Sequence, residues 1–111
     1  MKQAVHHWWF QRLTAVILAP LCLWFIFSLA CMSGLDHASV HSWIKSPLQS
    51  LLLILFSLAI FYHAHLGLQV VIEDYVGNNS LRNTCIYLSM FIMLFAGLVS
   101  IMAVLKIVLD L

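Results

Sequence analysis

The side chains with the most obvious chemical potential in this 111-residue chain lie between positions 62 and 75, inside and just after an apolar stretch. They are Tyr62, His63, His65, Gln69, Glu73, Asp74 and Tyr75. Polar and ionisable groups at membrane depth are costly, and they usually face a partner or a cavity. This segment is therefore the first place to look for a site.

His63 is the candidate for binding a cofactor. It lies 11 residues before Asp74, which is roughly 16 Å along a helix axis and near the middle of a hydrocarbon layer about 30 Å thick. Gly67 follows one turn later on the same face, where a missing side chain lets a flat, bulky group approach. Neutral imidazole beside such a space is what an axial haem ligand requires. The alternative is a histidine that only hydrogen-bonds to a neighbouring helix.

His65 belongs to a different face of the same predicted helix, because two residues correspond to a rotation of about 200°. The two histidines therefore cannot easily serve one site. Since His63 alone lies at clear mid-membrane depth, a six-coordinate haem would need its second ligand from another chain.

Other candidates lie near the ends of the apolar stretches. His6 and Arg12 precede the first stretch, where cations could pair with haem propionates or simply anchor the chain among headgroups. Tyr75, next to Asp74, could donate a hydrogen bond to a quinone carbonyl or belong to an aromatic belt at the membrane surface.

The elements that must position these residues follow from composition. Apolar residues make up 64% of the chain and charged residues only 8%, against about 25% charged in a soluble domain. Uncharged stretches at 13–32, 48–72 and 83–105 are each long enough to span a bilayer as a helix. We expect an all-α integral membrane protein with three transmembrane helices. A net charge of +1 gives no footprint for nucleic acid.

The predicted single membrane domain covers residues 1–111. The first span contains Pro20, where we expect a kink, and it is read as a retained helix rather than a signal peptide. The remaining segments are an arm on the membrane surface (1–12), a loop that has room for a short surface helix (33–47), a second loop (73–82) and a tail (106–111).

Three spans put the N-terminus and the second loop on one side of the membrane. Lys2, Arg12 and Arg82 then share that side, against Lys45 and Lys106 on the other. Under the positive-inside rule this small excess favours a cytoplasmic N-terminus.

Two motifs carry a family resemblance: HHWWFQRLTA at residues 6–15 and HAHLGLQVVIEDYV at residues 63–76. With the three-span layout and the length, they make the chain similar to the hydrophobic membrane anchor subunit of succinate dehydrogenase, respiratory complex II, in its proteobacterial form. The resemblance covers essentially the whole chain, although residues 83–105 match only as an apolar span.

The resemblance implies roles for individual residues. His63 would be an axial ligand of haem b, with the other axial histidine supplied by the cytochrome b subunit. Tyr75, and more weakly Asp74, would line the ubiquinone site, and His6 and Arg12 would lie near the haem propionates. His7 beside His6 and His65 beside His63 leave room for reassignment, but only His63 has the expected spacing to Gly67 and Asp74.

The resemblance also implies partners and a location. The chain would anchor the flavoprotein and iron-sulfur subunits to the bacterial inner membrane and perform no hydride chemistry itself. Two alternatives stay open: a cofactor-free helical membrane protein, such as a transporter component or an assembly factor, and the anchor of a quinol:fumarate reductase.

Overall fold

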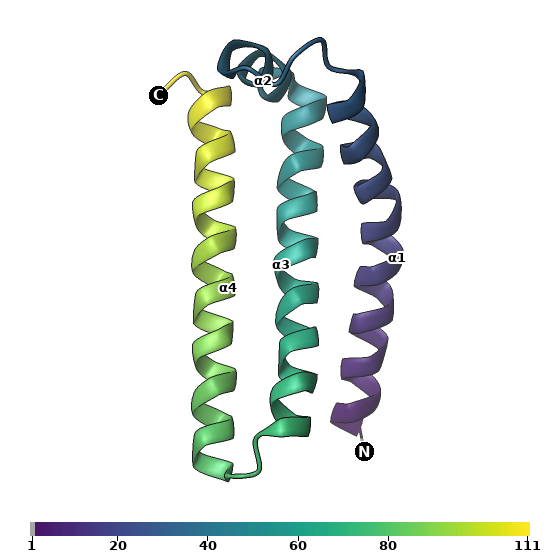
Figure 1. Cartoon of the computed structure of the whole chain (residues 1–111), viewed down its shortest axis with the longest axis vertical. Helices are drawn as coiled ribbons and strands as arrows, with labels where there is room; N and C mark the ends of the chain where they lie inside the picture. The colour runs from purple at the N-terminus through teal and green to yellow at the C-terminus, as the bar shows by residue number, and fades with distance from the viewer. Residues whose placement is uncertain (1) are drawn as a thin grey trace.

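The computed structural model describes residues 2–111, with side chains described from Val5 onward. Met1 and the side chain of Lys2, both within the predicted arm, lie outside this part. The described residues form four helices and no strand, which confirms the predicted all-α class. The helices are α1 (Lys2–Cys31), α2 (His37–Lys45), α3 (Pro47–Tyr75) and α4 (Asn79–Val108) (Figure 1).

Three of these helices are long and apolar enough to cross a membrane, as predicted. The candidate spans are Val5–Cys31, Pro47–Tyr75 and Asn79–Val108, and an 18-residue stretch within each has a mean hydropathy of 2.3, 2.0 and 2.5, respectively. At 1.5 Å per residue each is about 40–45 Å long, more than the hydrocarbon layer, so the helices must tilt or extend into the headgroup region.

The N-terminal arm differs from its prediction. Residues 2–12 form no separate surface segment, because α1 runs without a break from Lys2 to Cys31. No proline or glycine interrupts residues 2–19, so the helix can begin well before the first apolar stretch. Pro20 lies inside α1, which Figure 1 shows as a bowed but continuous helix.

Short polar signals set the other helix boundaries. Asp36 caps α2 by accepting a hydrogen bond from the Ser39 backbone N–H, and Asn78 caps α4 in the same way through Leu81. Pro47 occupies the first turn of α3, where its missing N–H costs nothing. The loop predicted at 33–47 thus contains the short helix α2.

The three long helices lie in a row with α3 in the middle (Figure 1). Within the described part of the chain α3 contacts both α1 and α4, whereas α1 and α4 do not contact each other. The N-terminus and the α3–α4 connection lie at one end, and α2 and the C-terminus lie at the other. The relative arrangement of the ends agrees with the predicted three-span topology.

Because the three long helices lie in a row, few side chains are buried between them. Among the described residues only Leu18, Leu66 and Val104 are buried apolar side chains, and Thr14, Ser50 and Ser89 are the buried polar ones. Many large apolar side chains on all three long helices are exposed. In a membrane these side chains must be covered by lipid or by helices of other subunits.

Aromatic contacts hold the helices together at the end of the row near α2. The ring of Trp43 on α2 stacks on Trp24 of α1 with centroids 5.6 Å apart, and Phe25 of α1 lies 5.2 Å from Phe56 of α3. These contacts hold α1 against α3 at one end. The histidine-containing part of the α1–α3 interface lies toward the opposite end.

Candidate functional site

His63 lies half-buried between α1 and α3 and bonds to a buried threonine. Its Nδ1 is 2.8 Å from Oγ1 of Thr14. The same Oγ1 is 2.8 Å from the carbonyl oxygen of Phe10 and 3.0 Å from that of Gln11. Thr14 is 8% exposed, so these contacts are shielded from solvent.

The positions of these acceptors decide which group donates. A hydroxyl has one proton and a carbonyl oxygen can only accept, so two carbonyl oxygens within 3.0 Å are favourable only if the hydroxyl donates toward them. Thr14 then accepts from His63 Nδ1, so in the neutral form of the imidazole the proton is on Nδ1. The lone pair is left on Nε2, for which the described residues supply no hydrogen-bond partner.

Two further side chains of α1 complete what we call the α1–α3 seam: His7, Gln11 and Thr14 on α1, against His63 and Gly67 on α3. His7 donates from Nε2 to the backbone oxygen of Leu66 at 3.1 Å. A Cβ added at Gly67 would meet Gln11 Nε2 at 3.8 Å, an ordinary contact distance. Gln11 Oε1 is buried without a partner among the described residues.

The sequence analysis named His7 only as an alternative to His6, and it did not predict Gln11 or Thr14 as site residues. The signal was present, because positions 7, 11, 14 and 18 share one face of a helix and the last of them, Leu18, is buried. Treating residues 1–12 as a separate surface arm concealed this periodicity.

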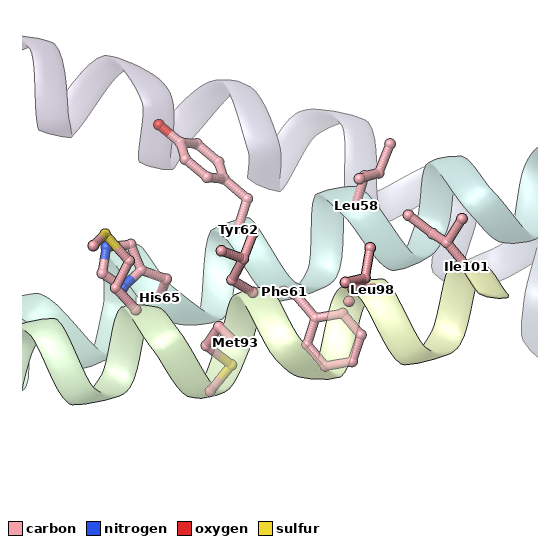
Figure 2. Close-up of a pocket in the computed structure, with 10 residues that line it drawn as sticks. Leu58, Phe61, Tyr62, His65, Met93, Leu98 and Ile101 are labelled. Carbon is pink, nitrogen blue, oxygen red and sulfur yellow. The ribbon is translucent and has the colours of Figure 1, made fainter. Parts of the chain in front are cut away.

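His65 faces the other neighbour of α3, as its rotation predicts. Its Nδ1 lies 3.5 Å from Oγ of Ser89 on α4, at the limit of a hydrogen bond. Figure 2 shows it at one end of a hollow of about 270 Å³ between α3 and α4, whose other labelled residues include Phe61, Met93 and Leu98. The two histidines therefore serve separate interfaces.

His6 and Arg12 are not brought to His63. Both are exposed, and the Arg12 guanidinium carbon lies over the Trp8 ring, 5.1 Å from its centroid. Relative to Thr14, two residues rotate Arg12 by about 200° around α1, onto the side away from α3.

Tyr75 and Asp74 lie at the end of α3 nearest the N-terminus. Tyr75 is the last helical residue and is 84% exposed. Asp74 is also exposed, and it lies on the same face of α3 as His63, three turns away. Neither side chain has a hydrogen-bond partner within the described residues, so both are accessible to another molecule.

The fit of the seam to a haem can be tested from these contacts. No three His, Cys, Asp or Glu side chains among the described residues are grouped to hold a metal ion. The fit is therefore tested for a single ligand from this chain, in a site shared with another chain. His63 Nε2 has no hydrogen-bond partner among the described residues, so this nitrogen could supply one ligand of such a site. The face of Gly67 is in contact with α1, because a Cβ there would lie 3.8 Å from Gln11 Nε2.

The fold and site together define a class: a three-span helical membrane protein with many exposed large apolar side chains and a mid-helix histidine whose Nε2 lone pair is available. Residues 1–105 match the family model for the succinate dehydrogenase/fumarate reductase transmembrane subunit. The chain belongs to this family.

Individual relatives agree with this family assignment. The chain is 40% identical over 85 residues to a succinate dehydrogenase hydrophobic membrane anchor subunit of Rickettsia bellii, covering 77% of this chain and 68% of the relative. A protein of the same name from Rickettsia conorii is 38% identical over 86 residues, with the same coverage. A succinate dehydrogenase membrane anchor subunit of Reclinomonas americana is 30% identical over 90 residues, covering 78% of this chain and 75% of the relative.

Proposed function

We propose that this chain is the hydrophobic membrane anchor subunit of a succinate dehydrogenase. It would hold the flavoprotein and iron-sulfur subunits at the membrane, beside a cytochrome b subunit. The names of its relatives support this role, and so do the large apolar side chains left exposed on the three long helices. The relatives also favour a succinate dehydrogenase over a quinol:fumarate reductase.

We infer that His63 is an axial ligand of haem b shared with the cytochrome b subunit. The observation that carries this inference is the bond from His63 Nδ1 to Thr14, which leaves the Nε2 lone pair available. When bound, haem supplies one-electron transfer at a potential that its axial ligands help to set. The alternative was a histidine that only hydrogen-bonds to a neighbouring helix. That bond is present, but it uses Nδ1 and is compatible with ligation through Nε2.

His6 and Arg12 are the cations we propose for the haem propionates. Both are exposed at the end of α1 nearer the seam, and Arg12 lies on the side of α1 away from α3. Propionate contact would therefore require the haem edge to reach around α1, or the α1 side chains to change rotamer when the partner subunit docks. The alternative role, anchoring among headgroups, fits the Arg12–Trp8 contact.

We propose Tyr75 as the residue that binds ubiquinone, with Asp74 contributing more weakly. A phenol hydroxyl can donate to a quinone carbonyl oxygen and so orient and polarise it. The exposure of Tyr75 at the end of α3 suits a site completed by other subunits. Succinate oxidation would take place on the catalytic subunits, and ubiquinone would receive the electrons near this tyrosine.

We propose the bacterial inner membrane as the location, with the N-terminus in the cytoplasm. The excess of Lys and Arg at the N-terminal end of the row supports this orientation. It would place Asp74 and Tyr75 on the side where the catalytic subunits dock. Reporter fusions to the N-terminus and to the α2 loop should give cytoplasmic and periplasmic signals, respectively.

The test of the anchor role is purification through a tag on this chain from its native membrane. Flavin, iron and succinate-dependent ubiquinone reduction should co-purify with the tag. A stable preparation that lacks flavin and iron would contradict the proposal and favour a cofactor-free transporter component or assembly factor.

A further inference from the structure

The hydroxyl of Thr14 stands between the backbone of α1 and the imidazole of His63. Three contacts converge on it: His63 Nδ1 at 2.8 Å, the Phe10 carbonyl oxygen at 2.8 Å and the Gln11 carbonyl oxygen at 3.0 Å. Thr14 is one of three buried polar side chains among the described residues. An exposed threonine of α4, Thr84, makes the same kind of backbone bond to Ser80 at 2.9 Å but has no histidine partner.

We propose that Thr14 is the positioning residue that fixes the tautomer and the ring orientation of His63, so that Nε2 is the nitrogen presented to the iron. This inference rests on the proposed haem site. In this inference, Thr14 on α1 orients the ligand His63 on α3. Thr14 does so without contacting the cofactor.

The argument depends on what a hydroxyl can and cannot do in this place. A neutral imidazole in isolation can carry its proton on either nitrogen. Beside Thr14 the choice is removed, because the two carbonyl oxygens of α1 attract the hydroxyl proton and leave the hydroxyl oxygen to accept from Nδ1–H. In the opposite tautomer Nδ1 carries no proton. It would then face the hydroxyl oxygen with no hydrogen bond between them, because the hydroxyl proton is directed to the carbonyl oxygens.

The ring orientation is fixed by the same contacts. The Thr14 hydroxyl is tied to the backbone of its own helix, one turn back, and its β-branched side chain has few χ1 rotamers there. The imidazole must therefore lie in the plane that brings Nδ1–H to this oxygen. Ligand histidines are commonly held through their second nitrogen in this way, and the bond also makes the ligating nitrogen more basic.

The experiment compares variants of the intact complex purified through a tag on this chain. Thr14→Val removes the hydroxyl and keeps the branched shape, Thr14→Ser keeps the hydroxyl, and Thr84→Val is the matched control. Two properties are measured: the rate at which haem is lost to an apoprotein haem acceptor, and the g-values of the ferric haem in electron paramagnetic resonance, which respond to the orientation of the axial rings.

Thr14→Val should lose haem about tenfold faster than the unmodified complex, at the lower end of the effect of removing a ligand's hydrogen-bond partner, and its g-values should shift. Thr14→Ser and Thr84→Val should match the unmodified complex in both properties. Unchanged haem loss and g-values in Thr14→Val would overturn the inference. So would a Thr14→Ser variant as defective as Thr14→Val, because the hydroxyl would then not be the determinant.

If Thr14→Val does not assemble, nitrogen-15 spectroscopy of the unmodified, reduced complex decides the question. With labelled histidine, the ligand from this chain should be protonated at Nδ1 and bound to iron through Nε2. Iron bound through Nδ1 would overturn the inference. An unmodified complex without haem would overturn the proposed haem site together with this inference, whereas equal haem retention and equal g-values in all variants would overturn only the role of Thr14.

Discussion

His63 and Thr14 share a 2.8 Å hydrogen bond although 49 positions separate them in the chain. The bond joins α3 to α1 within the seam, where His7 and Gln11 add further polar groups. It makes the position of α1 a determinant of the histidine's chemistry. The helix α1, predicted from the sequence as a surface arm followed by a membrane span, thus contributes directly to the candidate site.

Replacing Tyr75 with Phe should weaken ubiquinone reduction and leave assembly intact. The substitution removes one hydroxyl from a side chain that is 84% exposed in this chain, so the fold loses nothing. A neutral hydrogen bond contributes about 1–1.5 kcal/mol, which corresponds to a decrease of about five- to thirteenfold in kcat/KM for ubiquinone.

Steady-state assays with succinate and a soluble ubiquinone analogue measure this effect. Tyr62→Phe is the control, since it removes a hydroxyl from the middle of α3 and keeps the ring that contacts Phe10. Equal kcat/KM values in Tyr75→Phe and the unmodified complex would remove Tyr75 from the quinone site.

Gly67→Ala should leave this chain folded but reduce its haem content. A Cβ there meets only Gln11 Nε2 at an ordinary 3.8 Å, and alanine favours a helix over glycine by about 1 kcal/mol. We expect the loss because the proposed haem would lie against this glycine, where the added methyl group would take up space. The measurement is haem per complex, with Gly97→Ala as control because its Cβ also makes an ordinary contact, 3.6 Å from Phe61. Full haem content in Gly67→Ala would show that the cofactor does not approach this position.

The start of α2 should depend on pH through Asp36. Hydrogen bonds from the Ser39 side chain and backbone N–H hold the pKa of Asp36 below its ordinary value of 3.8. Because the pKa is lower in the folded chain, the stabilisation of this helix start is fully present above about pH 4. It is lost as the pH falls through the lowered pKa.

Amide hydrogen exchange over residues 37–45, measured at neutral pH and again below about pH 4, tests the cap and its pH dependence. Asp36→Ala should decrease protection of the first turn of α2 at neutral pH, because the cap is absent at every pH. Asp36→Ser should preserve protection, since serine caps helices comparably and does not titrate in this range. Equal protection in Asp36→Ala and the unmodified chain would contradict the capping role.

Much of the fold could be predicted because it depends on local properties of the chain. Length and hydropathy identified three spans, and the rotation between His63 and His65 placed them on different faces of α3 without any knowledge of the neighbouring helices. The turn residues around Gly77 and the proline at position 47 marked helix boundaries for reasons that act within a few residues.

What could not be predicted depends on which helix lies beside which. The contact between Thr14 and His63 exists only because α1 packs against α3, and nothing in the sequence around either residue specifies that neighbour. The continuity of α1 through residues 2–12 was also missed, since aromatic and cationic residues favour both a surface arm and the end of a long span. Periodicity at 7, 11, 14 and 18 was the available clue.

The most direct test is a dithionite-reduced minus oxidised visible spectrum of the complex purified through a tag on this chain, recorded for the unmodified complex, His63→Ala and His65→Ala. We expect a b-type haem signal in the unmodified complex and in His65→Ala, and its loss in His63→Ala. A featureless spectrum from an intact unmodified complex, or a haem signal that survives in His63→Ala, would contradict the assignment of His63 as the haem ligand.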